Sequence, residues 1–209
     1  GEMAVPLVKG VQGADTAACV KHFALNNQET ERLWVEVKVS ERALREIYLP
    51  AFEKVVKEGH VYSVMGAYNR YNGEHCCESK ILLNGILRDE WKFDGMVVSD
   101  WGGVHLTKEA ATSGLDLEMS VTDNFDEYCM AESLKKAVEN GEIAEELIDK
   151  KVKNILRLMY RLNMLGKVLR KPGSYNTPEH RQKILDTARE SVILLKNDKK
   201  QLPLSQKKT

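Results

Sequence analysis

Residues 95 to 103 read GMVVSDWGG, an apolar run that ends at Asp100 and Trp101 before two glycines. A short, valine-containing run bounded by turn residues predicts a buried strand. Asp100 then has two interpretations. It is either the first polar residue of a turn, where it accepts hydrogen bonds from nearby backbone N–H groups, or a functional carboxylate at the carboxyl end of a parallel strand, where α/β proteins place their sites.

The overall composition excludes several classes of partner. The chain has 209 residues and 43% hydrophobic content, enough for one large domain, or for one domain and part of another. Its 31 Lys and Arg residues balance its 31 Asp and Glu residues. We therefore expect no nucleic acid and no anionic membrane as a partner, and an uncharged or small substrate fits better. No run approaches the roughly 18 to 20 apolar residues of a membrane helix, and the first ten residues lack a basic and apolar leader, so the compartment stays open.

The four cysteines do not have the spacing of a metal site. They stand at positions 19, 76, 77 and 129, with no CxxC pair and no Cys/His pattern. Buried or incidental thiols explain them better. We expect no metal and no cofactor.

Short apolar runs alternate with stretches of helical period, the pattern of βα units and a parallel sheet. The predicted strands lie at 18–23, 61–68, 95–99 and, more weakly, 114–119, and the predicted helices at 40–59, 79–91, 126–140 and 143–165. Ser40 is placed to cap the first of these helices, and Pro50 should bend it near Glu46. The fold class is therefore α/β.

The composition changes after residue 165. Residues 166–178 carry two prolines and two glycines and have no periodicity, which is typical of a connection between domains. Thr177 and Pro178 then open a last helix as N-cap and first helical residue. We predict one domain over 1–165, a linker over 166–178 and the beginning of a second domain over 179–209.

Three of the predicted strands end in polar or aromatic residues. Lys21 and His22 end the first, Tyr68 and Asn69 follow the second, and Asp100 follows the third. In a (β/α) barrel such strand ends converge on one bowl, to which several strands contribute catalytic residues. The functional interpretation of Asp100 is favoured for this reason.

Several segments resemble glycoside hydrolase family 3, the β-glucosidase and β-xylosidase group. They are KHFALNNQETER (21–32), SERALREIYLPAFE (40–53), MGAYNRYNGEHC (65–76), LRDEWKFDGMVVSDWGG (87–103) and GLDLEM (114–119). Near the end, ARESVILLKNDKKQLPL (188–204) looks like the beginning of that family's second, α/β sandwich domain. The resemblance implies the C-terminal half of a (β/α)8 TIM-barrel domain, about four βα units, followed by the first helix of the sandwich domain.

The resemblance also implies roles for individual residues. Asp100 matches the nucleophile of a retaining β-glucosidase, which forms a covalent glycosyl-enzyme intermediate. The matching residues that bind substrate are expected to hold the sugar hydroxyls, lie beside the nucleophile or offer an apolar face: Lys21, His22, Arg32, Tyr68 and Trp101. Met65 either lines the same pocket or is a core methionine.

Some family features have no match in this chain. The earlier barrel strands are absent, and about four strands cannot close a barrel of about eight. The family's general acid, a glutamate of the second domain, has no match, and Glu29, the carboxylate nearest to the KHF segment, is better explained as structural. Asn26, Asn27 and Gln28 favour the glucosidase-like branch over the subgroup that carries a His/Asp pair there. We therefore expect the chain alone to be inactive or nearly so, and to need the N-terminal barrel half and the second domain.

Two alternatives remain open from the sequence. One is a non-catalytic carbohydrate-binding or assembly piece that needs a second polypeptide, and the other is an unrelated parallel α/β protein in which Asp100 is only a cap. The first predicts sugar affinity without turnover. The second predicts that replacing Asp100 changes stability alone.

Overall fold

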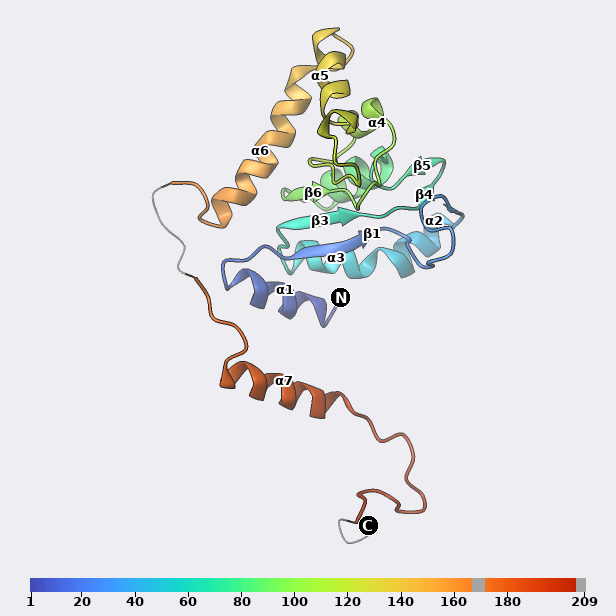
Figure 1. Ribbon diagram of the computed structural model, residues 1–209. Helices are drawn as coiled ribbons and strands as arrows, with labels where there is room; N and C mark the ends of the chain where they lie inside the picture. Colours follow the sequence, from blue (N-terminus) through green and yellow to red (C-terminus); the bar gives the residue numbers. More distant parts are fainter. Residues whose placement is uncertain (167–171, 206–209) are drawn as a thin grey trace. The chain divides into compact units, whose positions relative to one another are not determined.

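The computed structural model describes residues 1–166 and 172–205 (Figure 1). The chain divides into two units, Gly1–Val168 and Leu169–Thr209. The predicted linker falls partly on residues 167–171, which lie outside the described residues. The predicted division at 165 and 178 stays a prediction.

The centre of the first unit is a parallel sheet of three strands. These are β1 (Cys19–Phe23), β3 (Ser63–Gly66) and β6 (Met96–Val98), in the order β1-β3-β6. All three were predicted from their apolar runs. The predicted fourth strand is reduced to one parallel bridge between Val98 and Leu117. The ladder is this short because the Asp116 carboxylate, rather than a backbone carbonyl, accepts the hydrogen bond of the Val97 amide at 2.7 Å.

Helices cover one face of this sheet, as Figure 1 shows for α1 (Ala4–Gln12) and α3 (Pro50–Lys57). The core holds strand residues such as Phe23, Val64 and Val97, each fully buried. The Phe23 ring meets Phe52 edge-on at 5.2 Å between centroids. Adjacent residues of β3 and β6 are buried, which is typical of the strands of a parallel sheet covered on both faces.

The predicted helix over 40–59 forms in three parts. The short α2 (Glu41–Ala43) starts at Ser40, whose hydroxyl accepts a hydrogen bond from the Ala43 amide at 3.2 Å. A π-helical segment, η1 (Leu44–Tyr48), follows and contains Glu46, where the bend was predicted. Pro50 is the first residue of α3. Proline lacks an N–H to donate, so the helix restarts there.

A second, small sheet was not predicted. It consists of β2 (Glu36–Val37), β4 (Arg70–Tyr71) and β5 (Glu74–His75), each two residues long. The antiparallel pair β4 and β5 is joined by Asn72 and Gly73, which both have positive φ, 52° and 81°. An Asn-Gly pair is typical of such a two-residue hairpin turn, because both residues tolerate positive φ. Strands of two residues carry too little periodicity to be seen in the sequence.

The remaining helices of the first unit are η2, α4, α5 and α6. A π-helical η2 (Ile81–Glu90) occupies the predicted 79–91 segment, α4 (Thr107–Thr112) was not predicted, and α6 (Glu145–Arg161) lies within the predicted 143–165. The helix predicted over 126–140 is wrong in its first half, because Asn124 caps a single 3-10 turn, η3 (Phe125–Glu127). The α-helix there, α5, covers only Glu132–Glu139.

The second unit contains α7 (Pro178–Ser191), capped as predicted by Thr177, whose Oγ1 accepts from the His180 amide at 3.2 Å. All of its described residues are at least partly exposed.

The described strands form two open sheets of three strands each and no closed barrel. Across residues 1–166 and 172–205, no helix is long and apolar enough to cross a membrane. The same residues contain no cluster of three or more metal-ligating side chains. All four cysteines are free, and Cys76 and Cys77 are buried, in agreement with their interpretation as structural or incidental thiols.

Candidate functional site

Asp100 lies directly beyond the carboxyl end of β6 and is 6% exposed. Its Oδ1 accepts a hydrogen bond from the Trp101 amide at 2.9 Å, and its backbone carbonyl accepts from the Gly103 amide at 3.0 Å. Gly102 has a positive φ of 67°, which a side chain would disfavour in this turn. Asp100 thus does begin a turn, as the cap interpretation predicts. Its second carboxylate oxygen points to another strand.

That second oxygen meets His22 at the end of β1, two strands away. The His22 Nε2 lies 3.3 Å from Asp100 Oδ2. Burial lowers the pKa of His22 and outweighs the opposing attraction of Asp100, while the charges of Lys21 and Arg32 lower it further. The imidazole is therefore neutral at neutral pH, so the 3.3 Å approach is a polar contact between a neutral ring and a carboxylate rather than an ion pair.

Tyr68 lies two residues beyond β3 and is buried. Burial raises the pKa of Tyr68, and the neighbouring Asp100 carboxylate raises it as well, so the phenol keeps its proton. The Arg32 guanidinium lies 5.1 Å from the centroid of the Tyr68 ring. Arg32 Nη1 is also 2.8 Å from Glu29 Oε2. Glu29, with its side chain 81% exposed, is thus occupied as the partner of Arg32.

The other predicted site residues lie around this group without bonding to it. Lys21 is exposed on β1, and its charge reaches His22. Met65 is half-buried in β3 and lies outside the core cluster that contains its neighbour Val64. The Trp101 ring is exposed. Within the described residues, no hydrogen bond joins the Lys21, Met65 or Trp101 side chain to Asp100.

Several neighbours of the site were missed by sequence reasoning. His75 Nδ1 lies 3.0 Å from the Tyr68 carbonyl oxygen. The buried Glu78 accepts hydrogen bonds from the His105 and Leu106 amides, both at 2.5 Å, and so holds the loop that follows the nucleophile candidate. The only sequence signal for these neighbours was the Asn72-Gly73 pair, whose turn brings the segment after it back toward Tyr68. Nothing local indicates that Glu78 meets a loop 27 residues away.

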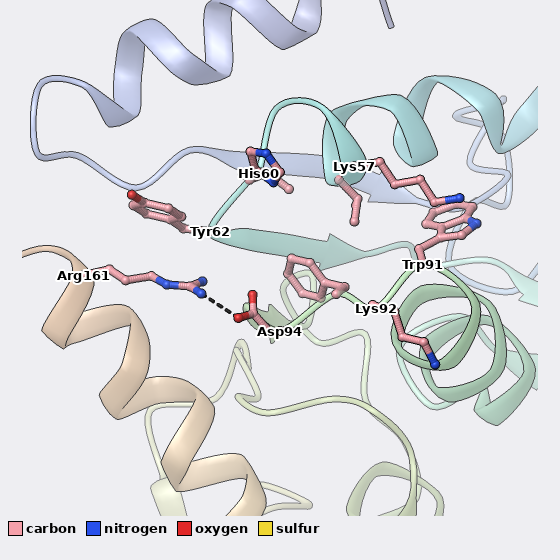
Figure 2. Close-up of a pocket in the computed structure, with 10 residues that line it drawn as sticks. Lys57, His60, Tyr62, Trp91, Lys92, Asp94 and Arg161 are labelled. Atoms are coloured by element: carbon pink, nitrogen blue, oxygen red, sulfur yellow. Dashed lines mark hydrogen bonds and ion pairs between the residues drawn. The ribbon is translucent and has the colours of Figure 1, made fainter.

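A cavity of about 490 Å³ lies at the opposite end of the sheet (Figure 2). Its walls include Tyr62 before β3, Asp94 before β6 and Arg161 at the end of α6. Arg161 Nη2 is 2.6 Å from Asp94 Oδ2, and its guanidinium lies 5.3 Å from the Tyr62 ring centroid. Because active sites of parallel α/β folds lie at the carboxyl ends of the strands, we do not place the candidate site in this cavity.

The Asp100 group has the chemistry of a nucleophilic site. At this strand end the Asp100 carboxylate accepts a backbone hydrogen bond at Oδ1 and lies 3.3 Å from a neutral imidazole at Oδ2, beside a protonated phenol and a guanidinium. The neighbouring donors suit the hydroxyl groups of a sugar, and a carboxylate so placed can act as a nucleophile.

Comparison with known proteins identifies the family of the chain. Residues 1–158 match the Glycosyl hydrolase family 3 N terminal domain. The chain is 45% identical over 206 residues to Beta-glucosidase BoGH3A of Bacteroides ovatus, covering 94% of this chain and 27% of that protein. It is 39% identical to an Exo-alpha-(1->6)-L-arabinopyranosidase of Bifidobacterium longum, over 98% of this chain and 26% of the relative.

Solved structures show the same similarity. Beta-glucosidase 3B from Thermotoga neapolitana in complex with alpha-D-glucose has a TM-score of 0.88 and 39% identity, over 98% of this chain and 29% of that chain. A Bifidobacterium adolescentis GH3 beta-glucosidase has a TM-score of 0.86 and 37% identity, over 96% of this chain and 28% of that chain. The chain spans about a quarter of the length of the curated relatives it matches. With the family match covering 158 residues, the chain belongs to glycosyl hydrolase family 3.

Proposed function

We propose that this chain carries the nucleophile and part of the sugar-binding subsite of a retaining β-glycosidase that acts on terminal, non-reducing β-D-glucosyl or related residues. The observation that carries the proposal is the Asp100 carboxylate, buried at the end of β6 and 3.3 Å from His22 of β1. Several relatives are named beta-glucosidases, and solved relatives bind glucose.

In the proposed first step, an oxygen of Asp100 attacks the anomeric carbon. The new C–O bond forms as the bond to the leaving group breaks, and the leaving group takes that electron pair. Neutral His22 and protonated Tyr68 stabilise the free carboxylate as proposed hydrogen-bond donors. Neither of them carries a positive charge that would neutralise the carboxylate. Lys21, His22 and Arg32 are proposed to bind the sugar hydroxyls, while Met65 and Trp101 offer apolar faces to the ring.

Acid assistance to the leaving group is proposed to come from outside the Asp100 group. Glu29, the carboxylate next to the site in sequence, is exposed and paired with Arg32. A retaining enzyme needs its second carboxyl group about 5 to 5.5 Å from the first. General acid catalysis is worth about 10² to 10⁴ in rate, so the chain by itself should turn over natural glycosides very slowly.

We also propose that the chain corresponds to the C-terminal half of the family's barrel and the first helix of its sandwich domain. Three parallel strands with helices between them, and with Asp100 at the end of the third, support the first part. The capped helix α7, which belongs to the second unit, supports the second part. A piece that binds sugar without turnover is the second candidate, and the open sheet favours it.

Covalent labelling tests the proposal without needing the acid. The chain, alone and mixed with a polypeptide that supplies the earlier barrel strands, is treated with a 2-fluoro-β-glucoside that carries an activated leaving group. Intact mass and peptide mapping should then find one glycosyl adduct, on Asp100. If the folded chain acquires no adduct, either alone or in the mixture, but still binds glucose, the non-catalytic proposal would replace this one.

A further inference from the structure

A second cavity, of about 400 Å³, lies between η2, the end of α4 and α6. Asp94, which precedes β6, is among its lining residues, whereas Asp100 of the candidate site follows β6. The cavity therefore lies at the amino end of this strand, away from the candidate site. Its volume is in the range of sites that bind small molecules, about 300 to 1,000 Å³.

Positive charges outnumber negative charges on the walls of this cavity. Five cationic residues and two acidic residues line it: Arg88, Lys150, Lys151, Lys153 and Arg157, and Asp94 and Asp116. Both carboxylates already have cationic partners. Asp116 Oδ2 is 2.6 Å from Arg88 Nη2, and Figure 2 shows Asp94 paired with Arg161, at 2.6 Å between Oδ2 and Nη2. The Lys151 ammonium donates to backbone carbonyls around the end of α4, so three cations are left to meet a ligand.

The three other cations, Lys150, Lys153 and Arg157, lie on one face of α6 at i, i+3 and i+7. None of them forms an ion pair with a residue that the structure describes. Arg157 Nη1 donates to the Asp94 carbonyl at 2.5 Å and to Asn154 Oδ1 at 2.9 Å, which holds the guanidinium in place. Its Nε–H and Nη2–H groups have no hydrogen bond to the described residues, and they can donate together to two oxygens of one anion.

The dipole of α6 does not explain these lysines. A cation stabilises the carboxyl end of a helix, but the effect falls off within the last turn. The helix ends at Arg161, so Lys150 and Lys153 lie two turns or more before its end. From residue 150 to residue 161 the helix carries five cations and no carboxylate, although the whole chain is neutral. This local excess of positive charge indicates an anionic ligand.

One lining residue offers an acceptor instead of a donor. The Oδ1 atom of Asn84 is buried and has no hydrogen-bond partner among the described residues. Nδ2 of the same amide donates to the Thr112 carbonyl at 3.4 Å, so the oxygen is left for a separate donor. A buried polar atom costs free energy until it is paired, and a hydroxyl group is a donor that brings no further positive charge into this cationic cavity. We therefore expect the ligand to carry a hydroxyl group as well as an anionic group.

We infer that this cavity binds a small anion that carries hydroxyl groups, of the sugar phosphate class. Its phosphate group meets Arg157, Lys150 and Lys153, and one of its hydroxyl groups donates to Asn84 Oδ1. Three cations favour a phosphate monoester, with a charge of about −1.5 to −2 at pH 7, over the single charge of a carboxylate. Binding at this cavity does not depend on the role of Asp100.

Isothermal titration calorimetry of the folded chain with glucose 6-phosphate measures this binding. Saturating glucose is present throughout, so that the sugar-binding subsite proposed around Asp100 is occupied. Glucuronate and inorganic sulfate are the comparison ligands, because the first carries a single negative charge and the second carries no hydroxyl group. Glucose 6-phosphate should bind more tightly than either, and its affinity should fall as salt is added.

Substitutions then locate the bound anion. Arg157→Gln and Lys153→Gln should each raise the dissociation constant for glucose 6-phosphate by about tenfold, because each removes a charge-assisted bond. Lys153 is exposed, so its replacement should leave the fold intact. Lys9→Gln removes an equal charge from an exposed position of α1 and should change the constant by less than about twofold. Asn84→Ala should weaken binding of glucose 6-phosphate by about threefold to tenfold and leave binding of sulfate unchanged.

Each contrary result removes a stated part. If glucose 6-phosphate does not bind, or if Lys9→Gln weakens its binding as much as Lys153→Gln does, the cavity is not an anion site. If glucuronate binds more tightly than glucose 6-phosphate, or if Asn84→Ala weakens sulfate equally, the sugar phosphate class is wrong. Labelling of Asp100 by the 2-fluoroglucoside should be unchanged in Lys153→Gln, so these results are independent of those for the proposed function.

Discussion

Asp100 and Asp116 are two carboxylates of the same sheet with almost the same burial, 6% and 5% exposed. Both carboxylate oxygens of Asp116 accept hydrogen bonds from protein groups. Its Oδ2 accepts from Arg88 at 2.6 Å and from the Val97 amide at 2.7 Å, and its Oδ1 accepts from Asn154 at 2.9 Å. Asp100 accepts one backbone bond at Oδ1 and meets His22 at 3.3 Å on the other oxygen.

The surroundings of Asp116 are built for stability. Arg88 also donates to the Gly114 carbonyl at 2.7 Å, and Lys151 donates to the Ala110 and Ser113 carbonyls at 3.2 and 3.0 Å. These bonds join η2, α4 and α6 to the end of the sheet. Burial raises the pKa of Asp116, and Arg88, Val97 and Asn154 oppose that rise.

The comparison shows that burial alone does not identify a functional carboxylate. A buried group whose oxygens are all saturated by protein donors has no capacity left for a substrate. Asp100 is less saturated and faces the donors of two other strand ends. Incomplete satisfaction at a strand end, rather than burial, is the feature that separates the two.

The largest effect is expected from Asp100→Asn. The amide is a very poor nucleophile, so labelling by the 2-fluoroglucoside should fall by more than about a thousandfold. The free energy of unfolding, measured by urea denaturation, should change by less than about 1 kcal/mol because the Trp101 amide keeps an acceptor. A loss of stability with unchanged labelling would return Asp100 to the role of a cap.

The matched variant Asp116→Asn should lower the stability of the fold and leave labelling of Asp100 unchanged. It leaves the Arg88 guanidinium without its counter-charge in a buried setting, which costs about 3 kcal/mol of unfolding free energy. Labelling of the fraction that remains folded should not change. If labelling of the folded fraction fell as it does in Asp100→Asn, the division of roles between the two carboxylates would be wrong.

Lys151→Met tests the same network through pH. Burial lowers the pKa of Lys151 to about 8 from its ordinary value of 10.5. Between these values the unfolded chain binds more protons than the folded chain, so the stability of the unsubstituted protein should rise with pH relative to Lys151→Met, by up to about 3 kcal/mol. Below pH 8 the difference should be constant. Urea denaturation at a series of pH values measures it, and a flat difference across this window would contradict the lowered pKa.

The smallest effect is expected from Arg32→Lys. The ammonium keeps the charge but loses the planar stack on Tyr68, worth about 1 kcal/mol or a fivefold slower labelling rate. Stability should change by less than about 0.5 kcal/mol, because the Arg32–Glu29 pair is exposed. The rate of labelling by the 2-fluoroglucoside measures this loss, and an unchanged rate would remove Arg32 from the proposed subsite.

Local signals explain what the sequence predicted well. The strands at Cys19–Phe23, Ser63–Gly66 and Met96–Val98 follow from short apolar runs, and the caps at Ser40 and Thr177 from single hydroxyl residues. The Asn72-Gly73 turn follows from residues that tolerate positive φ. Each of these features depends on residues within a few positions of one another.

The predictions that failed depended on distant partners. The segment around Leu117 pairs over one bridge only, because the Asp116 side chain replaces a ladder bond. The helix predicted from residue 126 begins at Glu132, because Asn124 caps a separate turn. Neither the Glu78 contact with the His105 loop nor the contact between the His75 and His105 rings leaves a periodic trace in the sequence.

The sequence by itself determined the three strands of the central sheet, the capped starts of two helices and the place of Asp100 at a strand end, since backbone propensity, capping and apolar period are local properties. Only the tertiary structure decided that His22 meets Asp100, that three protein groups donate to Asp116 and that the Trp34 ring lies beside the rings of two histidines. These contacts join residues 19 to 78 positions apart, and their distances depend on how the strands and helices pack, which no local pattern encodes.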